Sequence, residues 1–298
     1  MTARVAVVTP VRGRREHLRA QRASLAGQLG PDAEHVVVPV DDPELAGELA
    51  RGSGAGTVVS AVDGHPLGLP VAAARNAGAA LALARGAEVL VFLDVDCLAG
   101  PGLVPGYRRA VQEAPEVVWS GPVTYLDPPP AGGYLLDALA ALDAPHPARP
   151  APAAGERLLG ASPELFWSLS FACSAAAWER TGGFCESYVG YGGEDTDLGQ
   201  QVVAVGLQHG WLGDARAYHQ WHPVSRPPVE HVDDIVRNAA LFRSRWGWTP
   251  MGGWLEQLAG LGLVHRTDDG GWGRTPAHTE VGSAPASAPA DPGSVLPG

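Results

Sequence analysis

Short runs of β-branched and other apolar residues recur through the first 120 residues, and segments of helical character separate them. The runs are RVAVVT, HVVVPV, TVVSAV, EVLVFLDV and EVVWSG, which begin at residues 4, 35, 57, 88 and 116. Continuous apolar strands that alternate with helices are typical of a parallel sheet covered on both faces. The pattern therefore predicts an α/β fold for this half of the chain.

Three segments have the periodicity of amphipathic or buried helices: residues 16–29, 70–86 and 194–206. Gly86 and Gly206 stand where the second and third of these segments should stop, because glycine is the common residue just after a helix. Two other stretches break the pattern. Residues 126–155 contain the proline-rich runs DPPPAGG and APHPARPAPAAG, which predict a surface loop or lid, and residues 276–298 have the composition of a disordered tail.

The composition excludes several classes of partner and of chemistry. A net charge of −11 repels a polyphosphate, and no basic patch stands out, so we expect no nucleic-acid partner. The chain contains no lysine, which excludes a Schiff base, a pyridoxal-phosphate anchor and a P-loop lysine. A phosphate group would have to be held by arginine, by the backbone or by a metal ion.

Cysteine spacing and hydropathy argue for a globular protein of the cytoplasm. Cys97, Cys173 and Cys185 match neither a disulfide framework nor a zinc ribbon and are expected to be small buried residues. The chain does not start with an apolar leader, and no apolar run approaches the roughly 18 residues of a membrane span. We therefore expect a cytoplasmic protein with no integral membrane segment.

Charged residues follow three of the predicted strands. Arg12 and Arg14 come after the first strand, Asp41 after the second, and Asp94 and Asp96 after the fourth. Ligands of open α/β sheets bind beyond the carboxyl ends of the strands, so we expect these side chains to meet at one rim. Arginines and carboxylates together suit an anionic ligand bridged by a metal ion.

The triplet Asp94-Val95-Asp96 can present two carboxylates to the same side, because residues two apart in an extended segment point the same way. Hard oxygen ligands favour Mg²⁺ or Mn²⁺, which commonly lie between a carboxylate and a substrate diphosphate. Short acidic triplets also arise by chance on solvated turns, so the triplet alone is weak evidence.

His219 and His222 follow another predicted strand end, and an imidazole beside Asp96 would favour Mn²⁺ over Mg²⁺. The alternative is an ordinary pair of surface or core histidines. Histidines without such a context are expected to be structural: His17, His35, His65, His146 and His209.

The stretch VGYGGEDTDLGQQV, residues 189–202, collects Glu194, Asp195 and Asp197 directly after a glycine-rich loop. Acids in the first turn of a helix commonly cap free N–H groups and favour the helix dipole. The functional interpretation assigns one carboxylate as general base and another as acceptor for a substrate hydroxyl. Spacing alone leaves both interpretations open.

Four segments, taken in order, match one family: PVRGRREHL (10–18), AARNAGAAL (73–81), FLDVDCL (92–98) and the block 170–202. On these motifs the chain resembles glycosyltransferases of the GT-A fold, in particular lactose-synthase-type galactosyltransferases and their bacterial relatives in the inverting family two. The resemblance implies a single Rossmann-like nucleotide-sugar-binding domain with a mostly parallel central sheet and a smaller acceptor-side region. It divides residues 1–275 into a nucleotide-binding half (1–125), the proline-rich insertion (126–155) and an acceptor and catalytic half (156–275).

The resemblance also implies roles for individual residues. Asp195 would be the catalytic base, Glu194 would hold acceptor or donor hydroxyls, and Asp197 would organise the helix start. Asp96 with His219 or His222 would bind the metal. Together with the residues at the strand ends, the donor site is expected to comprise Pro10, Val11, Arg12, Arg14, Asp41, Arg75, Asp94, Asp96, Tyr191 and Gly193.

The function implied is metal-dependent, inverting transfer of a sugar from a nucleoside diphosphate, with uridine favoured over guanosine, to a hydroxyl of a glycan or small molecule. Mn²⁺ or Mg²⁺ would be the cofactor. Tyr191 stands where galactosyl members commonly have tryptophan, and 126–155 has no counterpart, which leaves donor and acceptor open. The alternatives are a retaining GT-A transferase and a catalytically inactive nucleotide-sugar-binding protein. A nucleotidylyltransferase usually relies on basic residues that include lysine, which this chain lacks.

Overall fold

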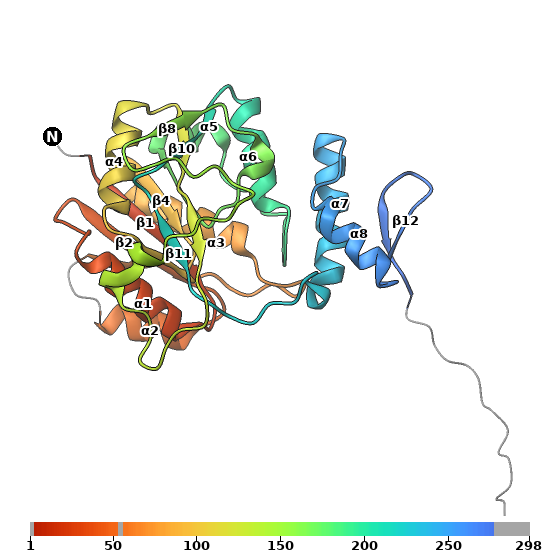
Figure 1. Cartoon of the computed structure of the whole chain (residues 1–298), viewed down its shortest axis with the longest axis horizontal. Helices are drawn as coiled ribbons and strands as arrows, with labels where there is room; N and C mark the ends of the chain where they lie inside the picture. Colours follow the sequence, from red (N-terminus) through yellow and green to blue (C-terminus); the bar gives the residue numbers. More distant parts are fainter. Residues whose placement is uncertain (1–2, 53–55, 277–298) are drawn as a thin grey trace, which may run out of the picture.

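The computed structural model describes residues 3–52 and 56–276. Its centre is an eight-stranded sheet in the order β3-β2-β1-β4-β9-β6-β10-β8 (Figure 1). The strands are β1 (Val5–Val11), β2 (Ala33–Pro39), β3 (Thr57–Val59), β4 (Val89–Leu93), β6 (Val117–Ser120), β8 (Arg157–Leu159), β9 (Ser170–Ser174) and β10 (Gln208–Leu212). The first four in the order are parallel to one another, as are β6 and β10, whereas β9 and β8 run antiparallel to their neighbours. All of the strands predicted from the apolar runs are confirmed.

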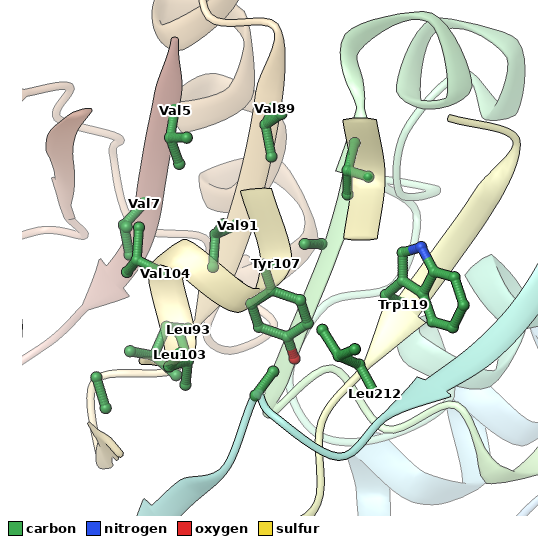
Figure 2. Packing of buried hydrophobic residues seen from close by; sticks show 14 of the residues in the cluster. Val5, Val7, Val89, Val91, Leu93, Leu103, Val104, Tyr107, Trp119 and Leu212 are labelled. Atoms are coloured by element: carbon green, nitrogen blue, oxygen red, sulfur yellow. The ribbon is translucent and has the colours of Figure 1, made fainter. Parts of the chain in front are cut away.

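Helices cover both faces of this sheet. They are α1 (Arg15–Ala26), α2 (Pro43–Gly52), α3 (Val71–Ala84), α4 (Leu103–Glu113), α5 (Ala175–Thr181) and α6 (Glu194–Ala204). Alternation along β1 sends Val5 and Val7 to the α4 side and Ala6 and Val8 to the α3 side. Figure 2 shows the α4 layer, a cluster that contains the buried Tyr107 together with Val7, Val91, Leu93, Val104 and Leu212.

The alanine-rich helix α3 lies very close to the sheet. A Cβ at Gly78 would come within 2.5 Å of Val8 and 2.8 Å of Val38, so only glycine fits at this contact. The same helix carries Arg75, whose side chain is 4% exposed. Tight packing of α3 on β1 and β2 therefore fixes the position of this arginine relative to the strand ends.

A second sheet of three strands assembles residues from three distant parts of the chain. It has the order β5-β11-β7, with β5 (Cys97–Ala99), β7 (Val123–Tyr125) and β11 (Ala217–His219). Because β11 pairs antiparallel with β5, His219 lies opposite Cys97, one residue beyond Asp96. The predicted carboxylate and imidazole ligands thus meet through strand pairing.

The proline-rich insertion is anchored along its length. It contains the 3₁₀ helix η1 (Leu136–Leu142), in which Leu139 is buried. Further along, the Arg149 guanidinium lies 5.1 Å from the ring of Trp167 and 4.6 Å from that of Trp211. The expected loop therefore includes a helical turn and a buried cation–π anchor.

The C-terminal part of the described chain has a hydrophobic cluster of its own, built around Ile235, Leu255, Leu258 and Trp272. Its elements are η3 (Val229–His231), α7 (Val232–Trp246), α8 (Gly252–Gly260), β12 (Val264–Arg266) and β13 (Trp272–Arg274), at the blue end of Figure 1.

Another 3₁₀ turn, η2 (Pro163–Leu165), packs against α6 in the main body. Across residues 3–52 and 56–276, no helix has the length and apolar character needed to cross a membrane.

Candidate active site

Asp96 lies at the centre of a possible cation site. Its Oδ2 atom is 3.5 Å from Nε2 of His219 and 3.5 Å from Nε2 of His222. One ligand atom from each of the three residues lies within 4.8 Å of the others. The backbone supports this geometry, since Gln220 N donates to Asp96 O at 2.6 Å. A carboxylate with two imidazoles is a donor set that suits Mn²⁺.

Arg14 contacts the same carboxylate. Its Nη1 donates to Asp96 Oδ2 at 2.7 Å, whereas the buried Oδ1 has no hydrogen-bond partner among the described residues. Burial opposes ionisation of Asp96, but the contact with His222 and the charges of His219 and Arg14 lower its pKa to about 2. The carboxylate is therefore ionised at neutral pH and has a free oxygen, so the residues present fit a divalent cation.

Arg75 joins the two acidic segments of the sequence. Its Nη2 donates to Asp94 Oδ1 at 2.8 Å and its Nη1 to Glu194 Oε1 at 3.3 Å. The guanidinium also lies 5.0 Å from the ring centroid of Phe184. Arg75 is buried and needs counter-ions, which Asp94 and Glu194 provide. The arginine thereby joins the end of β4 to the start of α6.

Glu194 and Asp195 are the first two residues of α6, directly after Gly193 in a left-handed conformation. Asp195 Oδ1 accepts a hydrogen bond from Thr196 N at 2.7 Å. Burial and the neighbouring Asp195 charge raise the pKa of Glu194 to about 7, although Arg75 opposes this. Burial also raises the pKa of Asp195, against the Thr196 N–H and Arg75. Both carboxyls are thus more basic than ordinary surface acids.

The raised pKa of Glu194 predicts a pH-dependent difference in stability. Between its ordinary value of 4.5 and about 7, the folded state binds more protons than the unfolded state, so stability falls as pH rises through this window. Glu194→Gln removes this titration and keeps an oxygen for Arg75. The difference in free energy of unfolding, variant minus wild type, should therefore increase by about 1–3 kcal/mol as the pH is raised from about 5 to about 8. Denaturant unfolding of both proteins at both pH values measures this difference. The same stability difference at about pH 5 and at about pH 8 would contradict the prediction.

The residues predicted for the nucleotide side gather at the carboxyl ends of β1 and β2. Arg12 Nη2 lies 3.0 Å from Asp41 Oδ2, with both side chains half exposed. Arg14 and Asp41 adopt positive φ angles of 41° and 50°, a conformation that non-glycine residues keep mainly where the surroundings enforce it. Pro10 is partly buried, and the Val11 side chain is buried in the core, so a contact of Val11 with a ligand would fall to its backbone.

Tyr191 lies in an aromatic group that sequence reasoning missed. Its ring stacks on His231 at 4.5 Å and on Trp254 at 5.5 Å between centroids, and the residue is 40% exposed. His17, expected to be structural, lies near the cation site, with its ring centroid 6.3 Å from that of His222. Neither His231 nor Trp254 belongs to a motif, so only their position after the acidic segment 189–202 could have pointed to them.

Asp197 does not have the capping role expected from the sequence. Its fully buried carboxylate accepts hydrogen bonds from Tyr188, Arg245 and Trp246 at 3.1, 2.6 and 2.6 Å, and from Gln201 at 2.6 Å. A buried carboxylate needs such donors because its desolvation is costly. The acid therefore joins α6 to α7.

Comparisons with protein-family models and with curated proteins both find similarity to sugar transferases. A model described as the N-terminal domain of galactosyltransferase matches residues 162–235. Two proteins named validoxylamine A glucosyltransferase are 31% identical over 225 residues. The one from Streptomyces hygroscopicus subsp. limoneus is matched by 68% of this chain and over 48% of its own length. For that from S. hygroscopicus subsp. jinggangensis (strain 5008) the shares are 68% and 52%, so the chain spans about half the length of these relatives.

Solved structures share the fold at low sequence identity. A crystal structure of GalNAc-T7 with UDP, GalNAc and Mn²⁺ has a TM-score of 0.57 and 14% identity, covering 87% of this chain and 57% of that one. The crystal structure of S. aureus TarS 1-349 has a TM-score of 0.54 and 14% identity, covering 80% and 64%. The GT-A fold predicted from the sequence is confirmed, and the comparisons as a whole support a transferase enzyme.

Proposed function

We propose that the protein is a metal-dependent, inverting glycosyltransferase that moves a sugar from a nucleoside diphosphate to an acceptor hydroxyl. The observation that carries the proposal is the single acidic centre formed through Arg75. On one side of this arginine lies Asp94, two residues before Asp96 of the possible cation site, and on the other lies Glu194, next to Asp195. Such a centre can bind a diphosphate and deprotonate a hydroxyl within one site.

Asp195 is the proposed general base. Its hydrogen bonds within the described residues all go to Oδ1, which leaves Oδ2 available to accept the hydroxyl proton of the acceptor. Its raised pKa increases its strength as a base. A single base that acts on the acceptor is sufficient for direct displacement with inversion, unlike the two carboxyl groups of a hydrolase.

Glu194 is proposed to orient a hydroxyl of the donor or the acceptor. Arg75 contacts only one of its oxygens, Oε1, at 3.3 Å. With a pKa of about 7, the carboxyl is partly protonated near neutral pH and can then donate as well as accept a hydrogen bond. Asp94 is fixed by Arg75 and is proposed to contact the ribose or the donor sugar.

Asp96, His219 and His222 would hold the cation, Mn²⁺ or Mg²⁺. When bound, it would supply positive charge to stabilise the diphosphate leaving group. Arg12 and Arg14 supply cationic side chains of the chain itself at the same rim. Because the chain has no lysine, these arginines and backbone N–H groups are the proposed protein contacts of the phosphates.

A donor screen tests this function directly. UDP-glucose is the first donor to try, because both relatives are named glucosyltransferases and the GalNAc-T7 structure contains UDP. Hydrolysis of UDP- and GDP-sugars with Mn²⁺ and no acceptor, followed by transfer to validoxylamine A and other polyhydroxylated acceptors, should show selective turnover. Anomer analysis of the product by NMR distinguishes inversion from retention. Metal-dependent binding of nucleotide-sugars without any product would instead identify a binding protein.

A further inference from the structure

We infer that Asn238 of α7 is a positioning residue for the two carboxylates at the start of α6. This inference rests on the proposed function, but the contacts that support it are independent of it. The loop 189–193 ends directly at Glu194, so the conformation of this loop sets where Glu194 and Asp195 lie. The sequence alone gives this glycine-rich loop the character of a flexible segment.

One buried amide holds the loop backbone. Asn238 Nδ2 lies 3.2 Å from Val189 O, 3.2 Å from Tyr191 O and 2.8 Å from Gly192 O. The residue is fully buried, and within residues 3–52 and 56–276 its Oδ1 has no hydrogen-bond partner. The side chain therefore acts on the loop as a donor, directed at the backbone carbonyls of Val189, Tyr191 and Gly192.

Two charged residues of the same helix complete the contact. Tyr191 N donates to Asp234 Oδ2 at 3.2 Å, and Arg237 Nη2 donates to Val189 O at 2.7 Å. The fit is tight, because a Cβ at Gly190 would lie 2.2 Å from the Asp234 carboxyl carbon. Gly190 also has φ of 78°, which favours glycine for a second reason. Side chains of α7 thus donate to carbonyl groups of the loop and also accept from its Tyr191 N–H group.

The far end of α7 is joined to α6 as well. Asp197, three residues after Glu194, accepts from Arg245 and Trp246 near the end of α7. The helix α7 therefore contacts both the loop 189–193 and Asp197, and it acts as a rigid support for the residues between these contacts, Glu194 and the proposed base Asp195. Since Asn238 and Arg245 lie beyond residues 162–235, these supporting groups come from outside the matched galactosyltransferase segment.

The test compares Asn238→Asp with a control on the same helix. Aspartate has nearly the same shape but cannot donate when ionised, and its charge faces three carbonyl oxygens. Arg243→Ala is the control, because Arg243 pairs with Asp269 in the C-terminal hairpin region. UDP binding with Mn²⁺, kcat and KM for UDP-glucose, and hydrogen exchange of the amides at 190–195 are measured for each.

For Asn238→Asp we expect kcat to fall by about 100-fold, since a small displacement of a catalytic group has an effect of this order. UDP affinity should stay unchanged, and exchange at 190–195 should rise while that of β4 does not. Asn238→Ser keeps one donor and should recover part of kcat. If the aspartate variant does not fold, Asn238→Ser is compared instead with Asn238→Ala, which has no donor and should have the lower kcat. Arg243→Ala should match the wild type.

Unchanged loop exchange in the Asn238 variants would overturn the inference, and so would an equal loss of kcat in Arg243→Ala. If the wild type turns over no nucleotide-sugar, the proposed function fails, and hydrogen exchange alone decides whether Asn238 positions the loop.

Discussion

The Asp195→Asn variant is expected to lose about 10²–10⁴-fold in kcat, the usual contribution of a positioned general base. The amide keeps an oxygen that can accept from Thr196 N, so the start of α6 should retain its geometry. It cannot take the proton of an acceptor hydroxyl. Binding of UDP with Mn²⁺ should be unaffected, because the proposed diphosphate contacts come from Arg12, Arg14 and the cation site.

The pH profile provides a second measurement on the same variant. Transfer by the wild type should rise with pH as Asp195 loses its proton, with a midpoint above the ordinary range of an aspartate because burial raises its pKa. The residual activity of Asp195→Asn should lack this rise. Glu256→Gln is a matched control, an exposed acid on α8 paired with Arg266, and should leave the profile unchanged. Full activity of Asp195→Asn would remove the base assignment.

Local pattern was enough to predict five strands of the central sheet and the rim at which charged residues meet, whereas β8, β9 and β10 were not among the predicted strands. The run RVAVVT predicts a strand buried on both faces, and β1 indeed sends Val7 to one layer and Val8 to the other. The order of strands and helices then requires that the ends of β1, β2 and β4 meet. Arg14 and Asp96 were therefore expected at one rim, and they lie 2.7 Å apart.

Long-range contacts could not be predicted in this way. Arg75 and Glu194 are 119 positions apart in the chain, and nothing in either segment indicates that one binds the other. Asp197 is the clearest error: three acids in a first helical turn are typical of caps, whereas its donors come largely from Tyr188, Arg245 and Trp246. Periodicity describes neighbours along one element, but such contacts depend on how α7 packs against α6.

Some predictions remain as they were made. The proposed tail lies outside the described residues apart from residue 276 itself. The boundaries of the nucleotide-binding half, the insertion and the acceptor half stay predictions, as do the cytoplasmic location and the choice of donor. The insertion is nevertheless close to the site, because Tyr134 OH accepts from Trp221 N at 3.0 Å, next to His222.

Removal of divalent cations is expected to have the other large effect on activity. Treatment with EDTA should lower transfer by at least about 100-fold, since charge stabilisation by a bound cation is worth several kcal/mol. Mn²⁺ should restore the rate better than Mg²⁺, because His219 and His222 provide nitrogen ligands next to the Asp96 carboxylate. Initial rates during stepwise addition of each cation measure this preference.

Ligand variants separate a cation held by these side chains from one that arrives only with the nucleotide. Asp96→Asn, His219→Ala and His222→Ala should each weaken Mn²⁺ binding in the absence of nucleotide by more than about tenfold, as measured by electron paramagnetic resonance. His265→Ala, a substitution of an exposed histidine on β12, is the control and should bind Mn²⁺ as the wild type does. If the three variants keep wild-type affinity, the cation is not held by this group. Transfer that is indifferent to both EDTA and Mn²⁺ would contradict metal dependence altogether. Arg12 and Arg14 would then have to neutralise the charge of the diphosphate without a cation.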